Sequence, residues 1–197
     1  MGAVRRRGKY VRVSLDHDEV RLLHELVEQV AELLGGDDPS TPVPDDEDET
    51  ETEMLEHMLE SSTEPVIAPD DPVLRRLLPD GYRNDDDAAG EFRRLTESSL
   101  RSTKRVALQR MIDDLSKPSA QQKDGRFRFD LDEAAVEAWL PALTDLRLAF
   151  GTRIGVTEDI DAERAEVLEG SLRHAELAAY DWMSWLQDAI VRGLTGD

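Results

Sequence analysis

The sequence contains no cysteine. This absence excludes a disulfide framework, a thiolate nucleophile and a cysteine-ligated metal site. Long hydrophobic runs are missing as well. No stretch approaches the roughly eighteen consecutive apolar residues of a membrane-spanning helix, and the basic start of the chain lacks the apolar run of a signal peptide. We therefore expect a cytoplasmic protein without a membrane partner.

Positive charge is absent from one long window of the chain. No lysine or arginine occurs between Arg21 and Arg75, and that window carries seventeen acids, which account for most of the formal net charge of -20. A surface of this sign opposes broad binding to DNA or to anionic membranes. We therefore do not expect a nucleic acid partner.

The 197 residues suit one compact domain with an insert. Residues 1–36 and 54–197 carry the patterns of folded elements. Residues 37–53 hold three prolines and a run of acids, with too little apolar surface to offset the entropy of ordering. We interpret this segment as a disordered acidic linker, and a specific acidic docking tail is the alternative.

Two short stretches alternate in the manner of strands. In Tyr10 to Leu15 the apolar side chains fall on one face, and residues 126–129 read RFRF. These stretches could pair as a small two-stranded β-ribbon. The helices are predicted over about 17–34, 72–78, 88–115, 131–140 and 171–191, with a kink or break near Pro141. Asp16 with Glu19, and Asp130 with Glu133, match the capping box. The fold class is therefore mainly α, a single helical bundle.

The chain is organised around the segment 139–159. Trp139, Leu143, Leu146 and Phe150 recur at steps of four, three and four, which places them on one stripe of a helix. Three polar residues lie in or beside this stripe. They are candidates for a pocket that binds a ligand or a partner's carboxylate, and ion pairing within the fold is the alternative. They are Asp145, Arg147 and Arg153, and the same site could include Tyr82 and Arg83.

The long helix predicted over 88–115 carries a concentrated basic face. Its members project within about a third of the helix circumference at about 100° per residue. This face could be solvated, could contact the acidic insert or an acidic partner, or could contact nucleic acid. The residues are Arg93, Arg94, Arg101, Lys104 and Arg105.

No catalytic constellation is visible. The four histidines are scattered, no glycine-rich phosphate loop matches, and no serine stands in a nucleophile-elbow context. We therefore expect no enzymatic activity, no cofactor and no metal. The aromatic last helix, with Tyr180, Trp182 and Trp185, suits either a core element or the seam of a homodimer.

Three blocks of the sequence carry a resemblance to a known family. They are DPVLRRLLPDGYRNDDDAAGEFRRLTESSLRSTK, WLPALTDLRLAFGTRIGVTED and AYDWMSWLQDAIV. In these blocks the chain resembles an actinobacterial family of unknown function whose genes commonly lie beside the gene for ClpS, the adaptor of the Clp protease. The resemblance covers most of the chain outside the acidic insert and implies no catalytic residues.

The resulting hypothesis is a non-enzymatic regulatory or adaptor protein. It would act through protein–protein contacts, and the resemblance suggests ClpS or a Clp protease component as the partner. A DNA-binding transcriptional regulator is the alternative. The acidic residues at the starts of the predicted helices count against it, because a recognition helix begins with basic or amide side chains.

Overall fold

The computed structural model describes residues 2–35, 67–82, 84–118, 120–123 and 125–195. The linker predicted over 37–53 and the apolar segment after it lie outside these residues. The elements in chain order are β1 (Ala3–Arg7), β2 (Tyr10–Leu15), α1 (His17–Gly35), α3 (Pro72–Leu77), α4 (Asp86–Ser116), β3 (Ala120–Lys123), β4 (Arg126–Leu131), α5 (Glu133–Arg153), α6 (Ile160–Glu166) and α7 (Leu172–Thr195).

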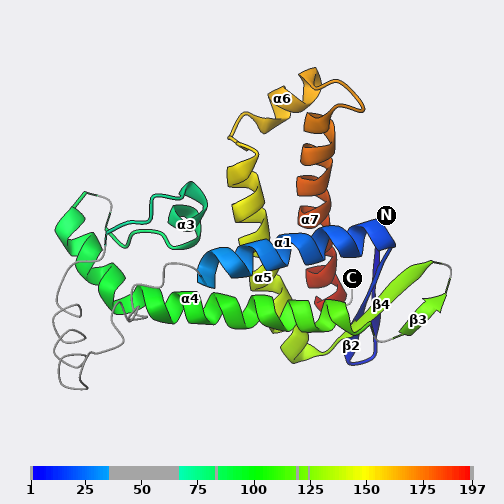
Figure 1. Cartoon of the computed structure of the whole chain (residues 1–197). Coiled ribbons are helices and arrows are strands. Elements are labelled where there is room, and N and C mark those ends of the chain that lie inside the picture. The colour runs from blue at the N-terminus through cyan, green and yellow to red at the C-terminus, as the bar shows by residue number, and fades with distance from the viewer. Residues whose placement is uncertain (1, 36–66, 83, 119, 124, 196–197) are drawn as a thin grey trace, which may run out of the picture.

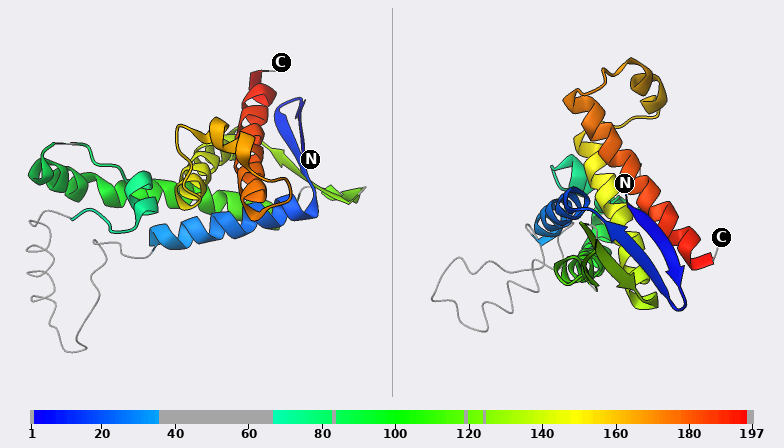
Figure 2. Two further views of the ribbon diagram at one scale, coloured as in Figure 1. Left: turned by 90° about the horizontal axis from the view of Figure 1, so that it is seen from above. Right: turned by 90° about the vertical axis from the view of Figure 1, so that its right-hand side faces the viewer.

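Two antiparallel helix pairs form the body of the molecule. Helices α1 and α4 run side by side, and α5 and α7 form a second pair that crosses the first (Figure 1). Helix α6 joins α5 to α7 at the end farthest from α4, and the sheet lies at the end of α1 that is nearest the N terminus (Figure 2). The prediction of a mainly helical chain is confirmed.

The small sheet is larger than the predicted ribbon. The predicted pairing is confirmed, because β2 and β4 are antiparallel with Val13 opposite Phe129. Strands β1 and β3 add to the two edges and give the order β1-β2-β4-β3. Strand β1 joins β2 through a tight turn at Gly8, whose φ of 63° favours glycine. The fold is therefore not a pure helical bundle.

The core forms where the sheet meets the helices. The inner face of the sheet buries Val13 and Leu15 of β2, and the predicted stripe on α5 packs into the same cluster. Trp139, Leu143 and Leu146 are at most 1% exposed, as the spacing predicted. Met183, Leu186 and Ile190 of α7 belong to this core, and Trp182 and Trp185 are half-buried against it, which supports the core interpretation of the aromatic helix. The homodimer seam stays a prediction.

The predicted break at Pro141 is wrong, and the alternative of a kink there stays a prediction. Helix α5 is continuous from Glu133 to Arg153 and includes Pro141. A proline inside a helix removes the hydrogen bond to the carbonyl four residues earlier. Here both Pro141 and Glu137 are exposed, so solvent can satisfy the freed carbonyl.

One of the two predicted capping boxes is present. The Glu19 amide donates to Asp16 Oδ1 at 3.0 Å, and the Asp16 amide donates to Glu19 Oε2 at 2.9 Å. The second prediction is wrong, because β4 extends to Leu131 and Asp132 caps α5 instead. Asp130 is a strand residue that lies opposite Arg12.

Candidate functional site

The predicted basic face of α4 is mostly turned inward. Arg93 and Arg101 are 7% and 2% exposed, and Glu97 between them is 4% exposed. This buried side of α4 continues towards its C-terminal end with Leu108 and Met111. The interpretation of a solvated basic face is therefore wrong for Arg93 and Arg101, because their guanidinium groups pair with carboxylates inside the fold.

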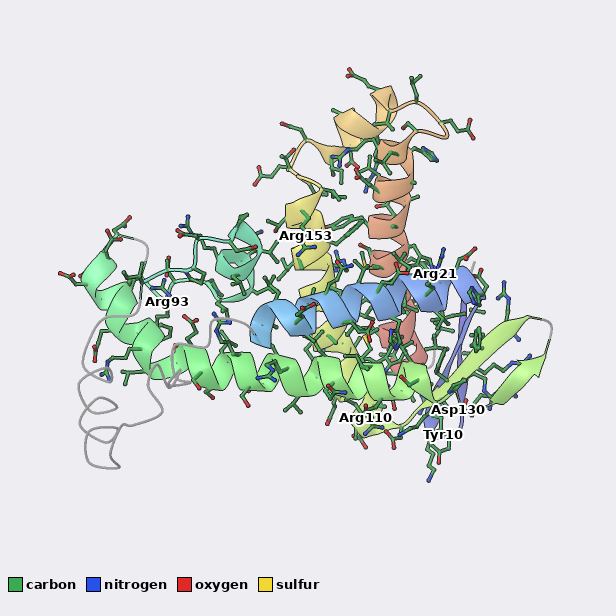
Figure 3. All side chains as sticks on the ribbon, in the orientation of Figure 1. Tyr10, Arg21, Arg93, Arg110, Asp130 and Arg153 are labelled. Carbon is green, nitrogen blue, oxygen red and sulfur yellow. The ribbon has the colours of Figure 1, made fainter. Side chains whose placement is uncertain are left out.

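The buried charges form a connected network. Arg101 Nε donates to Glu97 Oε1 at 2.8 Å, and Arg93 Nε lies 3.5 Å from Glu97 Oε2. Arg93 also pairs with Asp80 in the loop before α4, on the side of α4 that faces the α3 segment (Figure 3). Arg101 Nη1 donates to the Leu34 carbonyl at 3.3 Å. A cation thus lies at the C-terminal end of α1, where the helix dipole favours positive charge.

Lys104 belongs to a second pair, which is partly buried. Its Nζ donates to Asp145 Oδ1 on α5 at 2.6 Å and so connects α4 to α5. Burial raises the pKa of the Asp145 carboxyl, and the hydrogen bond and charge of Lys104 lower it in part. Asp145 Oδ2 is buried without a hydrogen-bond partner among the described residues. The pair therefore fixes one packing of the two helices at some cost in desolvation.

The opposite side of α4 exposes apolar side chains. Leu95 and Val106 are 66% and 68% exposed, and Phe92 is 41% exposed. At 100° per residue these three side chains fall within about 60° of one another. Tyr82 is exposed beside them, with its ring centroid 6.1 Å from that of Phe92 in an edge-on arrangement. We call Tyr82, Phe92, Leu95 and Val106 the α4 ridge.

The other predicted site residues do not converge. Arg153 lies on the side of α5 that faces α1, where its Nη1 donates to Gln29 Oε1 at 3.3 Å (Figure 3). Arg147 points towards α7 and donates to Gln187 Oε1 at 2.8 Å. Asp145 faces α4, so α5 sends these side chains in three directions. Arg83 lies outside the described residues.

Two predicted basic residues of α4 remain near the surface. Arg94 pairs with Glu91 one turn earlier, at 2.6 Å between Nη2 and Oε1, and this pair flanks the α4 ridge. Arg105 is exposed and lies near Gly35, at the end of α1. The predicted contact of these residues with the acidic insert stays a prediction, because the insert lies outside the described residues.

A strongly basic surface that the sequence analysis missed lies on the outer face of the sheet. Alternate residues of β1, β2 and β4 point to this side, since successive side chains of a strand face opposite ways. A shallow cavity of about 390 Å³ there is lined by five arginines: Arg5, Arg7, Arg12, Arg126 and Arg128. We call these five residues the arginine sheet face. The available signal was the alternation of Arg126 with Arg128 on β4 and of Arg12 with its apolar neighbours on β2.

One carboxylate is embedded beside the arginine sheet face. Arg12 holds Asp130 with two hydrogen bonds of 2.6 Å. The hydrogen bond from Arg12 lowers the pKa of the Asp130 carboxyl, with burial acting in the opposite direction. Tyr10 and Asp130 mark this end of the molecule in Figure 3. Arg5 lies directly opposite Arg12 in the strand register, so positive charge is concentrated across two strands.

Two further kinds of feature are absent from the described ranges. No described helix is long and apolar enough to cross a membrane. Within the same part of the chain, no group of three or more histidine, aspartate or glutamate side chains could hold a metal ion.

The sequence model of the family "Domain of unknown function (DUF2017)" matches residues 1–194. The chain belongs to this family. A Mycobacterium tuberculosis protein named "Oxidative stress regulator AosR" is 34% identical over 207 residues, which cover 97% of this chain and 85% of that protein. The Mycobacterium bovis protein of the same name gives the same identity and coverage. No solved structure matches the chain.

Membership of the family confirms the resemblance found in the sequence. The names of these relatives suggest a regulatory role. The gene order beside ClpS is a separate expectation, which the match to the family does not test.

Proposed function

We propose that this protein is a non-enzymatic regulator that acts by binding another protein through the α4 ridge. The observation that carries the proposal is the pattern of α4, which buries the charged side chains of Arg93, Glu97 and Arg101 while Leu95 and Val106 are exposed. Exposed apolar side chains that gather on one face are typical of interaction sites. Tyr82 and Phe92 extend the ridge with aromatic rings, which are enriched at the centres of protein interfaces.

The partner that we propose first is ClpS or a Clp protease component. This choice depends on the gene order that the family resemblance implies, and the ridge supports only the general class of partner. The test is a titration of fluorescently labelled ClpS with the full chain, followed by anisotropy. We expect saturable binding that the Leu95→Asp substitution weakens by at least about tenfold, or 1.4 kcal/mol.

A matched control is available on the far side of the molecule. Leu168 is 80% exposed and lies outside the ridge, so Leu168→Asp adds the same charge without touching the proposed interface. We expect this variant to bind ClpS as the unsubstituted protein does. Equal weakening by both variants would contradict the ridge, and absence of any binding would contradict ClpS as the partner.

A homodimer is the other protein contact that we propose to test. The ridge can be covered by a second copy, since two such apolar faces would bury one another. Light scattering on the eluted chain distinguishes monomer from dimer, and Leu95→Asp should convert a ridge-mediated dimer to the monomer. A dimer that persists in this variant would place the contact elsewhere.

The arginine sheet face supports a second candidate function, the binding of nucleic acid. Guanidinium groups are suited to phosphate because they stay charged and offer bidentate hydrogen bonds. Five of them on an antiparallel sheet could follow a phosphate backbone even though the whole chain has a net charge of -20. The arginine sheet face therefore supports the DNA-binding alternative, whereas the acidic residues at the predicted helix starts count against it.

The salt dependence of DNA binding tests this second candidate. A labelled duplex is titrated at several salt concentrations with the unsubstituted chain and with Arg126→Gln/Arg128→Gln. We expect each lost phosphate contact to reduce the slope of log K against log salt by about 1. Arg105→Gln serves as the control, because Arg105 is exposed on α4, away from the sheet. An unchanged slope in the double variant would contradict this function.

The absence of cysteine limits how such a regulator could respond to oxidants. Thiol–disulfide chemistry is excluded within this sequence. Met111 and Met183 are fully buried, which protects their sulfur atoms from oxidation. We propose that the described residues transmit a signal by binding and do not sense an oxidant themselves. A peroxide treatment that leaves partner binding unchanged is the expected result.

A further inference from the structure

A cavity of about 560 Å³ lies among α3, the C-terminal half of α5 and the middle of α7. Its volume falls within the roughly 300–1,000 Å³ that is typical of small-molecule sites. Arginines from two helices line it, Arg75 and Arg76 of α3 and Arg147 of α5. None of the described residues that line the cavity is acidic. In a chain with a net charge of -20, three arginines in one cavity form a local site of positive charge.

The environment of Arg147 indicates that its charge is available to a ligand. Its described contacts are to neutral groups, since Nη1 donates to Gln187 and the guanidinium carbon lies 5.6 Å from the centroid of the Tyr180 ring. Its Nε is buried and has no hydrogen-bond partner among the described residues. A buried donor without an acceptor is costly, so an acceptor supplied by a ligand would be stabilising.

The two arginines of α3 complete the positive lining. Arg75 Nε donates to the Pro69 carbonyl at 2.6 Å, while its Nη2 lies 3.6 Å from the exposed Asp70. Arg76 has no ion-pair partner among the described residues. Thr157 adds a hydroxyl, which accepts the Asp159 amide at 3.3 Å and keeps its own hydrogen for donation.

We propose that this cavity binds a small molecule through a phosphate group. Guanidinium groups match the geometry of phosphate and can form two parallel hydrogen bonds to it. Because Arg76 is on α3 and Arg147 is on α5, one phosphate held by both would join the two helices. A ligand of this kind stabilises the folded chain, since it binds the folded state and not the unfolded one. This site goes beyond the macromolecular contacts proposed above.

Calorimetric titration of the full chain with inorganic pyrophosphate tests the proposal, with citrate at matched ionic strength as the carboxylate probe. We expect saturable binding of pyrophosphate in the millimolar range or tighter, and weaker binding of citrate. Arg147→Gln should reduce the affinity for pyrophosphate by about tenfold or more. The exposed Arg76→Gln should also weaken binding, and it keeps the test valid if Arg147→Gln impairs folding.

Arg105 supplies the matched control, because it is exposed on α4 and lines neither this cavity nor the arginine sheet face. Arg105→Gln removes the same charge there and should leave pyrophosphate binding unchanged. Loss of binding in Arg128→Gln with retention in Arg76→Gln and Arg147→Gln would overturn the proposal. No saturable binding of pyrophosphate, or tighter binding of citrate, would overturn it too.

Discussion

The buried network on α4 can be tested by removing its central carboxylate. Glu97→Leu removes the carboxylate that pairs with Arg101, whose side chain is 2% exposed and also donates to the Leu34 carbonyl. Removal of one partner of a buried ion pair lowers the free energy of unfolding by about 3–5 kcal/mol. That is a large part of a total stability of about 5–15 kcal/mol. For a chain of this size, the melting temperature should fall by about 6–20 °C.

The double variant separates the charge from the packing. In Glu97→Leu/Arg101→Met both charges are replaced by apolar groups of similar length, which is often neutral or stabilising. We therefore expect it to recover most of the loss, with a coupling energy of at least about 2 kcal/mol in a double-mutant cycle. Urea unfolding monitored by circular dichroism gives the four free energies of unfolding.

The control for this cycle lies on the same helix. Glu91 is exposed and pairs with Arg94, so Glu91→Leu should leave the urea midpoint nearly unchanged. If Glu97→Leu lowered the free energy of unfolding as little as Glu91→Leu, the charged face of α4 would be solvated. The inward orientation of Arg93 and Arg101 would then be refuted.

Two further predictions concern acid titration and the helix proline. Asp145 has a raised pKa, so its contribution to the free energy of unfolding is present below the unfolded-state pKa and is lost as pH rises. Asp130 has a lowered pKa, so its contribution is present above the unfolded-state pKa and is lost as pH falls. Urea titrations should therefore show the stability of the unsubstituted chain relative to Asp145→Asn falling as pH rises above about 4. The stability relative to Asp130→Asn should fall as pH drops below about 4. Equal slopes would contradict the two environments. Pro141→Ala should raise the free energy of unfolding by about 1–2 kcal/mol, because alanine restores a helical amide at an exposed position. A lower free energy of unfolding in this variant would show that the proline ring is needed.

The local elements could be predicted because their signals are contained in short windows. The spacing of Trp139, Leu143 and Leu146 is enough to define the buried side of α5. The capping pair Asp16 and Glu19 marks the start of α1 within four residues. Strand β1 could not be recognised in the same way, because three consecutive arginines conceal its alternation and its pairing with β2 depends on the turn at Gly8.

The orientation of α4 could not be predicted from its own residues. A helical projection separates the side of Arg93 and Arg101 from the side of Phe92 and Leu95, but the usual rule buries the apolar side. The opposite occurs in the N-terminal half of α4, because its buried side meets charged and polar partners on other segments, such as Asp80 and the carbonyl end of α1. Leu34 lies 67 residues before Arg101, and Asp80 lies in the loop before α4, so the sequence of α4 itself does not contain this information.

The preference for arginine over lysine connects these observations. The chain has twenty arginines and four lysines, and arginine can be buried with less loss of hydration while it keeps its charge. In α4 that property lets two guanidiniums hold helices together around one carboxylate. On the sheet and in the cavity beside α3, eight arginines are grouped with few acids, although the whole chain is strongly acidic. If the negative net charge were spread evenly over the surface, no such local sites of positive charge would exist. We therefore expect ligands of the chain to be selected at these two places by the geometry of their anionic groups, and substitutions that keep charge but lose the planar fork, such as Arg147→Lys, to weaken binding as well.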